Sequence, residues 1–124
     1  MYKIVSSRGG GRTTTLCEYA INNKKNIITP ALSSAKYIIG AIHNSLKQHG
    51  LDIIEEAPTS YGFYVVWEDS KGNSHEIDVI AVSKKDLNGL YFGDCVVDDA
   101  DEVLKMLVRE HLKQNVIGLT MSME

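Results

Sequence analysis

Hydrophobic positions predict one well-defined helix in the first half of the chain. Five apolar residues follow the three-and-four spacing by which a helix buries one face: Ala35, Ile38, Ile39, Ile42 and Leu46. Ser33 and Ser34 stand ahead of this run, and a serine hydroxyl is a common cap for the first N–H groups of a helix. Gly50 follows the run, where glycine commonly ends a helix. We therefore expect a helix that begins at the serines and ends at Gly50.

Two later segments have the composition of β-strands. Residues 61–68 and 75–82 are rich in β-branched and aromatic side chains, and the sequence Asp-Ser-Lys-Gly-Asn between them supplies a turn. The two segments are therefore predicted to form a hairpin. Alternation along its first strand places Phe63, Val65 and Trp67 on one face, so packing against a core accounts for these side chains without a ligand.

Shorter apolar segments complete the pattern. Strands are expected at residues 2–5, 27–29, 51–54, 90–97 and 116–121, and further helices at residues 13–22 and 100–114. Such alternation is typical of an α/β fold with a parallel-core sheet of about five strands and helices on both faces. We expect one domain over residues 1–124, with the hairpin, at about residues 61–82, inserted at or beyond the sheet edge. The last strand is expected between the first strand and the strand at residues 90–97.

Composition is that of a soluble globular protein. A chain of 124 residues, 44% of them hydrophobic, can bury one continuous core. It has no uninterrupted run of 18 apolar residues and no N-terminal hydrophobic segment of the kind that a secretion signal needs. We therefore expect a cytoplasmic protein with no membrane segment. Cys17 and Cys95 share no metal-binding spacing with each other or with a histidine, and two reduced thiols are expected.

Charge is distributed unevenly, although the net charge is only -3. Residues 1–50 contain seven of the 13 Lys and Arg residues and one of the 16 acidic residues, Glu18. Two interpretations stay open. The first part of the chain could face phosphate groups, or the two parts could compensate each other across one folded surface.

A glycine-rich segment separates the first strand from the first helix. It reads SSRGGGRTTT at residues 6–15. Glycines lack the Cβ atom that would block close approach, so successive backbone N–H groups can converge on phosphate oxygens at the start of a helix. The phosphate-binding pattern GxxxxGK[ST] fits residues 6–13, except that Ser6 replaces the first glycine and Arg12 replaces the lysine.

A second motif lies about 80 residues further along the chain. The apolar residues 95–97 are followed directly by Asp98 and Asp99. A carboxylate at the end of a strand beside a phosphate-binding loop is where a nucleotide hydrolase holds Mg²⁺. Alternatively, the acidic residues 98–102 would cap the next helix and match its dipole.

The ordered set of motifs resembles the P-loop NTPases of the helicase and phage-terminase kind, which share a RecA-like fold. Four segments appear in the order of that family: SSRGGGRTTT, IITPALSSAKYII, CVVDDADEVL and VIGLTMS. The resemblance covers nearly the whole chain and implies a protein of a phage or mobile element that binds ATP and Mg²⁺. It also implies that Thr29, Pro30 and Ser33 lie in a turn that touches nucleic acid, although a solvated basic face is an alternative for the lysines nearby.

The same resemblance implies a role for each site residue. Thr13 and Asp98 would hold Mg²⁺, and Asp99 would polarise the attacking water. Arg8 would act as an arginine finger in cis, or would be a solvated loop residue. The phosphates would be bound by Gly9, Gly10, Gly11, Arg12, Thr13 and Thr14.

Three departures from the family pattern weaken the expectation of catalysis. Arg12 is wider and planar where the family has lysine, and Asp99 is one methylene shorter than the usual glutamate. The second domain that closes the nucleotide site in helicases is not expected in this chain, so a protein partner or a second copy would complete the site. The sequence thus predicts nucleotide binding with weak, partner-dependent or absent hydrolysis. The alternative is a catalytically inactive P-loop fold that binds or inhibits a host protein or a nucleic-acid-processing complex.

Overall fold

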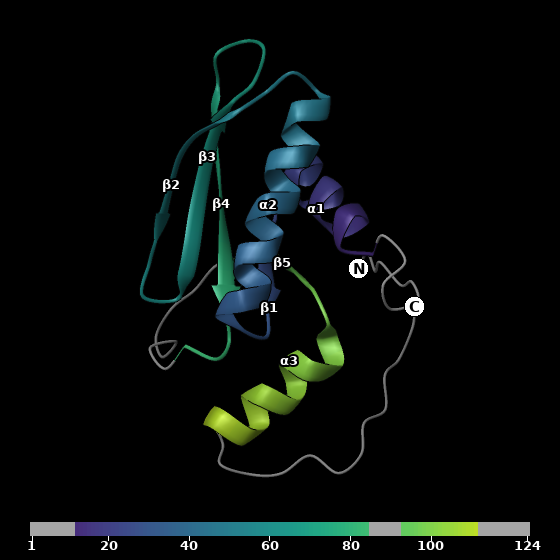
Figure 1. The fold of residues 1–124 in the computed structure, drawn as a ribbon, viewed down its shortest axis with the longest axis vertical. Coiled ribbons are helices and arrows are strands. Elements are labelled where there is room, and N and C mark those ends of the chain that lie inside the picture. Colours follow the sequence, from purple (N-terminus) through teal and green to yellow (C-terminus); the bar gives the residue numbers. More distant parts are fainter. Residues whose placement is uncertain (1–11, 85–92, 112–124) are drawn as a thin grey trace.

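The computed structural model describes residues 12–84 and 93–111. Within those two ranges the chain forms three α-helices, one π-helical turn and a sheet of five strands (Figure 1). The strands predicted at residues 2–5 and 116–121 lie outside the described residues, as does most of the glycine-rich segment. The α/β class agrees with the sequence pattern. The five described strands include both strands of the predicted hairpin, so they are not the five strands of the parallel-core sheet that was expected.

The sheet is mixed, with strand order β2-β3-β4-β1-β5. The five strands are β1 (Asn26–Thr29), β2 (Ile53–Pro58), β3 (Gly62–Glu68), β4 (Ser74–Ala81) and β5 (Cys95–Val97). β1 is parallel to both of its neighbours, β4 and β5, whereas β2, β3 and β4 form an antiparallel meander. The predicted hairpin is therefore present as β3 and β4. It continues the sheet beyond β1, because β4 pairs directly with β1.

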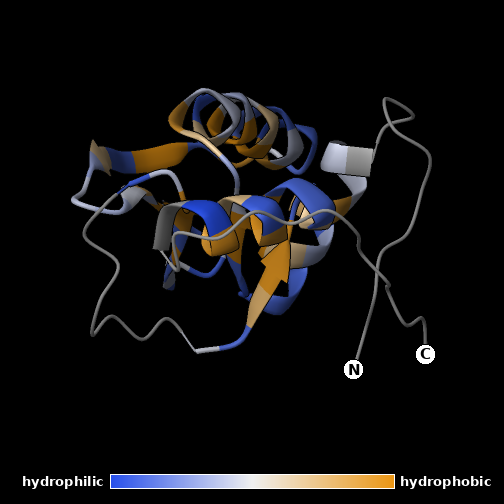
Figure 2. Ribbon diagram, turned by 90° about the horizontal axis from the view of Figure 1, so that it is seen from below, coloured by the Kyte–Doolittle hydropathy of each residue, from blue (hydrophilic) through white to orange (hydrophobic). Residues whose placement is uncertain are grey.

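Two helices, α1 (Arg12–Asn23) and α2 (Leu32–Gln48), cover one face of this sheet (Figure 1). Their apolar faces and the sheet residues beneath them form one buried cluster, in which Ile27, Ile38, Ile42, Leu46, Val65, Ile77 and Val79 are fully buried. Figure 2 shows hydrophobic residues on strands and helices alike, with hydrophilic residues alternating with them along the helices. The predicted alternation in the hairpin is confirmed, because Val65 and Trp67 are buried while Tyr64 and Val66 are only partly so.

The start of α2 differs in detail from the prediction. The helix begins at Leu32, with Ala31 in the cap position, so neither serine is the cap residue. Ser34 instead lies one turn inside, where its Oγ accepts the N–H of Ala31 at 3.1 Å and donates to the carbonyl oxygen of Ala31 at 2.8 Å. The serine still satisfies an N–H group at the helix start, but from the third helical position. Gly50 closes the helix as expected, with φ +72°.

Two features fix the hairpin. At its tip, Asp69 accepts the N–H groups of Lys71 and Asn73, each at 2.9 Å, and lies 2.9 Å from the ring of His75. These hydrogen bonds, the one with His75 above all, hold the pKa of Asp69 well below its usual range. At the other end, Gly62 has φ +154°, and a Cβ atom there would lie 2.1 Å from the carbonyl oxygen of Val79. Only glycine fits such a close approach of two backbones.

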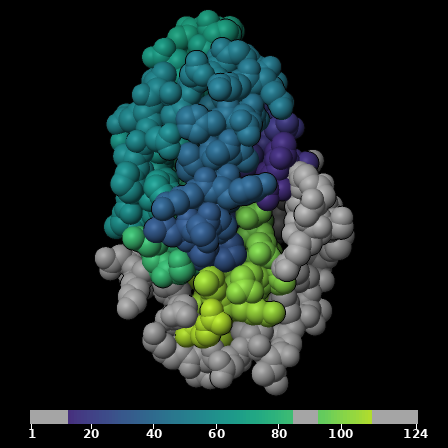
Figure 3. Space-filling view, viewed as in Figure 1, coloured from purple at the N-terminus to yellow at the C-terminus, as the bar shows by residue number. Residues whose placement is uncertain are grey.

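The last described elements follow β5. Helix α3 spans Ala100–Met106 and continues as a π-helical turn, Leu107–His111. Figure 3 shows α3 below α2 on the same side of the molecule. Of the strand predicted at residues 90–97, only Cys95–Val97 are strand, because Gly93 and Asp94 are described and are not, and residues 90–92 lie outside the described ranges. The helix predicted to residue 114 is described only as far as His111. None of the helices in the described ranges is long and apolar enough to cross a membrane.

Candidate functional site

The candidate site lies where the carboxyl ends of β1 and β5 meet the first turn of α1. The two strands are parallel and pair Ile28 with Val97, so they end at the same level. Because side chains alternate along a strand, Thr29 faces the same side as Ile27, and Asp98 the same side as Val96. That side is the one covered by α1 and α2. Ligands of parallel sheets bind at this edge.

The side chain of Asp98 is held by hydroxyl groups from two other elements. It is 9% exposed. The hydroxyl of Thr13, in the first turn of α1, donates to Oδ1 at 3.3 Å, across 85 positions of sequence. The hydroxyl of Thr29, at the end of β1, lies 3.3 Å from Oδ2. Each carboxylate oxygen therefore has a hydroxyl partner, and the site brings together the two residues predicted to hold Mg²⁺.

Thr29 is a site residue that the sequence interpretation placed differently. The family resemblance of the sequence implied that Thr29 lies in a turn that touches nucleic acid, yet the side chain of Thr29 is fully buried. Its Oγ1 lies 2.8 Å from Oγ of Ser34, in addition to its contact with Asp98. Thr29 thus connects the carboxylate to the first turn of α2. Thr29 follows the buried Ile27 by two positions, and this spacing indicates that both side chains face the same side of the strand. Its contact with Asp98 could not be predicted, because it depends on β5 lying beside β1.

Cys17 lies behind the site, one helical turn after Thr13, and is fully buried. Burial raises the pKa of its thiol to about 12, and the negative charges of Asp98 and Glu18 contribute in the same direction. A thiol in these surroundings stays protonated and unreactive at neutral pH. Both cysteines are free, as the sequence predicted.

Asp99 precedes α3 and has a left-handed backbone conformation, with φ 57° and ψ 59°. Aspartate and asparagine adopt this conformation more readily than a glutamate does. Asp99 occupies the cap position of α3, but its side chain makes no capping hydrogen bond, and Asp98 is engaged with the two threonines. The alternative interpretation of the acidic residues 98–102 is confirmed in part, because Asp101 and Glu102 lie in the first turn of α3, where they match the helix dipole, while the cap residue forms no side-chain capping hydrogen bond.

The remaining predicted residues are placed only in part. Arg12 is the first residue of α1, and Thr14 lies on the exposed side of that helix. The other residues of the expected phosphate loop, Arg8, Gly9, Gly10 and Gly11, lie outside the described residues. The structure therefore brings together Thr13 and Asp98, with Asp99 next in the chain, and does not describe the loop that would surround a phosphate.

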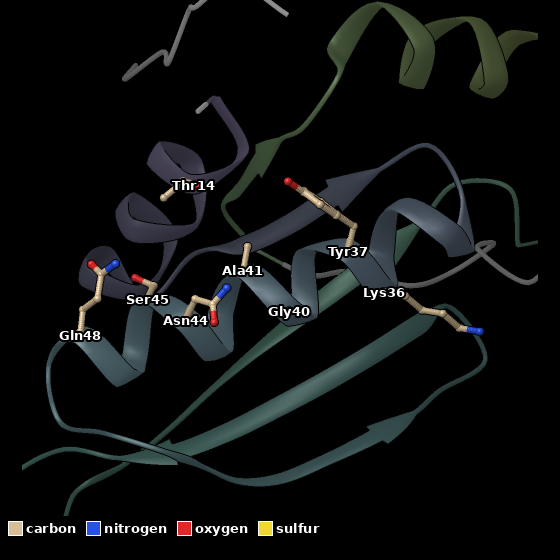
Figure 4. Close-up of a pocket in the computed structure, with 8 residues that line it drawn as sticks. All are labelled: Thr14, Lys36, Tyr37, Gly40, Ala41, Asn44, Ser45 and Gln48. Carbon is tan, nitrogen blue, oxygen red and sulfur yellow. The ribbon is translucent and has the colours of Figure 1, made fainter. Parts of the chain in front are cut away.

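A groove lies along α2, with Thr14 of α1 at one margin (Figure 4). It has a volume of about 260 Å³ and extends from Thr14 across the outer side of α2, past Gly40 and Asn44, to Gln48. Tyr37, at its other margin, is 70% exposed. The side chains that line it are mostly polar and include one cation, Lys36.

Oxygen atoms, rather than nitrogen or sulfur ligands, characterise the candidate site. Mg²⁺ prefers oxygen ligands, and it is usually bound by one or two carboxylates together with water and substrate phosphates. A threonine hydroxyl beside a buried carboxylate fits that preference. Among the described residues there is no cluster of three or more His, Cys, Asp or Glu side chains that could hold a metal without such help.

Comparisons with protein-family models, with curated proteins and with solved structures found no match to this chain.

Proposed function

We propose that this protein binds ATP together with Mg²⁺ in the manner of a P-loop NTPase, with weak, partner-dependent or absent hydrolysis. One observation carries the proposal: the hydroxyl of Thr13 contacts the carboxylate of Asp98, across 85 positions of sequence. In P-loop NTPases, Mg²⁺ is held by the threonine or serine of the phosphate loop and by an aspartate at the end of a neighbouring strand. The sequence motifs select these same two residues independently of the structure.

The strand arrangement supports the same proposal. β1 and β5 are parallel neighbours, and β5 forms one edge of the sheet as far as the described residues extend. The proposed P-loop fold adds the strands predicted at residues 116–121 and 2–5 beyond β5, in that order. The first strand would then lead through the glycine-rich segment directly to the N-terminus of α1. A phosphate at that position would be favoured by the helix dipole.

Thr13 and Asp98 are the residues that would hold Mg²⁺ in this site. When bound, the ion neutralises part of the negative charge on the β and γ phosphates. The chain's own contribution is to fix the two oxygen ligands before binding. Asp98 is buried and its backbone N–H donates to the carbonyl oxygen of Ile28 at 2.8 Å, so its position is set by the sheet.

Slow hydrolysis follows from two residues. Phosphoryl transfer is catalysed mainly by positioning, and a planar guanidinium at Arg12 cannot take the place of a lysine ammonium without moving its donors. Asp99 has a shorter reach than the glutamate of the family, and a displacement near 1 Å can cost about a hundredfold in rate. Binding requires only charge and N–H donors, which both residues leave intact.

Calorimetric titration with ATP, with and without Mg²⁺, tests the proposal when released phosphate is measured in the same samples. The wild-type protein should bind ATP more tightly in the presence of Mg²⁺. Thr13→Val and Asp98→Asn should each lose most of this gain, because each removes one oxygen ligand. Asp94→Asn is the matched control, since Asp94 precedes β5 and is exposed, with its carboxylate 3.1 Å from Lys25.

An absence of ATP binding by the wild-type protein would refute the proposal. So would an equal effect of Asp94→Asn and Asp98→Asn, because a general change in charge would then explain the result.

A catalytically inactive fold that acts through a protein surface is the second candidate function. The replacement of the family's lysine by Arg12 and of its glutamate by Asp99 favours it. The same samples bear on this candidate. Mg²⁺-dependent phosphate release favours the enzyme, whereas an absence of both ATP binding and phosphate release favours the interaction protein.

A further inference from the structure

We infer that Thr29 is a positioning residue, which orients Asp98 for Mg²⁺ and connects the metal site to the first turn of α2. This inference depends on the proposed function. It assigns Thr29 a task different from surface contact, because the side chain is fully buried.

Three contacts carry the argument. Thr29 Oγ1 lies 3.3 Å from Oδ2 of Asp98, on the opposite carboxylate oxygen from the one that Thr13 contacts. A carboxylate held at Oδ2 cannot rotate freely, so Oδ1 stays directed toward Thr13. Thr29 Oγ1 also lies 2.8 Å from Oγ of Ser34. Ser34 in turn binds both the N–H and the carbonyl oxygen of Ala31, immediately before α2.

Asp98 and Ser34 compete for the hydroxyl proton of Thr29. Ser34 uses its own hydroxyl proton to bind the carbonyl oxygen of Ala31, so its Oγ is an acceptor toward Thr29. Thr29 has a single hydroxyl proton, and two acceptors lie within reach, Ser34 Oγ and Asp98 Oδ2. An ionised carboxylate is the stronger acceptor, so the Thr29 proton is directed toward Asp98. Movement of the Asp98 side chain on metal binding therefore moves the Thr29 hydroxyl group, and the first turn of α2 responds through Ser34.

Titration with ATP, in Mg²⁺ and in EDTA, tests the positioning role with two variants. Thr29→Val keeps the size and shape of the side chain and removes the hydroxyl group. The ratio of its ATP affinity in Mg²⁺ to its ATP affinity in EDTA should be about tenfold lower than in the wild type, a typical effect for one hydrogen bond to a charged group. Its ATP affinity in EDTA should equal that of the wild type. Thr29→Ser restores the hydroxyl and should restore the gain.

NMR spectra of the amide groups test the connection to α2 without measuring activity. Addition of Mg²⁺ and ATP should shift the amide signals of Ala31 and Ala35 in the wild type and in Thr29→Ser. The amide of Gly72, at the hairpin tip, is the reference and should not move. Ser34→Ala removes the second acceptor by a change in α2 alone. It should keep the Mg²⁺-dependent affinity and lose the response at Ala35, so the inference can be tested even if Thr29→Val does not fold.

The outcomes distinguish a failure of the proposed function from a failure of the inference about Thr29. A wild-type protein that gains no affinity from Mg²⁺ would overturn the proposed function and this inference with it. A folded Thr29→Val variant with the full gain would overturn the inference alone. So would an unchanged response of Ala35 in Ser34→Ala.

Discussion

The backbone N–H of Asp98 donates a 2.8 Å hydrogen bond to the carbonyl oxygen of Ile28. This bond continues the parallel pairing of β1 and β5 one step past the last paired residues, Ile28 and Val97. The backbone at Asp98 is thus fixed by the sheet, independently of the contacts of its side chain. Changes in the Asp98 side chain therefore test the carboxylate itself, because they leave the end of the strand in place.

Replacement of Arg12 by lysine should increase ATP turnover. Lysine is the compact point charge that the family pattern contains, and its return should improve alignment of the transferred phosphate. We expect phosphate release to rise by about tenfold to a hundredfold at saturating ATP and Mg²⁺. The measurement is steady-state phosphate release, with ATP affinity determined by calorimetry on the same preparation.

Arg109→Lys is the control for this experiment, since it makes the same exchange in the π-helical turn after α3. Its turnover should equal that of the wild type. If Arg12→Lys binds ATP and releases phosphate no faster than the wild type, the guanidinium of Arg12 is not what limits turnover.

Stability should fall in alkaline solution because of Cys17. Burial raises the pKa of this thiol to about 12 in the folded protein, compared with 9.0 for an unperturbed thiol. A group whose pKa is raised by folding contributes stability below its unfolded pKa, and that contribution is lost as the pH rises toward the folded pKa. Between pH 9 and pH 10 the free energy of unfolding should therefore decrease by about 1 kcal/mol.

Denaturant unfolding of Cys17→Ala and its parent, both carrying Cys95→Ser, measures this effect. The decrease between pH 9 and pH 10 should be present in the parent and absent from Cys17→Ala. Tyr61, whose pKa is raised to about 12 by burial and by its hydrogen bond to Asp78, contributes in both proteins at still higher pH. Equal pH dependence of the two proteins would show that Cys17 is not buried as described.

The two cysteines should react with iodoacetamide at different rates. Cys95 is partly exposed, whereas Cys17, on the inner face of α1, is fully buried. At pH 8 the native protein should therefore gain one label quickly, and the second only as fast as the fold opens. Intact mass and peptide mapping identify the labelled residue. In Cys95→Ser the fast label should disappear, and rapid labelling of Cys17 there would contradict the structure.

Local sequence patterns were sufficient for the elements that bury one face. The spacing of Ile38, Ile39, Ile42 and Leu46 predicted α2, and the β-branched segments predicted the hairpin. β2 spans Ile53–Pro58 instead of the predicted residues 51–54. Its second half was missed because Glu55 and Glu56 are exposed, and exposed side chains leave no alternating signal. The first residue of α2 was missed because Ser34 satisfies the helix start from inside the helix.

The candidate site was predictable to the extent that its motifs are local. A hydroxyl at a helix start and an acid at a strand end indicated Thr13 and Asp98, and the structure brings them into contact. The link through Thr29 could not be predicted in this way. It depends on β1 lying between β4 and β5, and that order is set by packing over the whole sheet.

Gly62→Ala should destabilise the fold strongly. Gly62 has φ +154°, which other residues rarely adopt, and an added Cβ would lie 2.1 Å from the carbonyl oxygen of Val79. Neither backbone can yield easily, because Gly62 pairs with Ile80 in the ladder between β3 and β4. We expect a loss of at least about 3 kcal/mol in the free energy of unfolding, from strain and steric overlap together.

Gly40→Ala provides the opposite case within the same chain. Gly40 lies inside α2 with open space around the added methyl group, so this variant should gain about 0.5–1 kcal/mol from helix propensity. Urea denaturation of both variants measures the two effects, and a Gly62→Ala protein as stable as the wild type would show that β3 and β4 do not approach each other as closely as described.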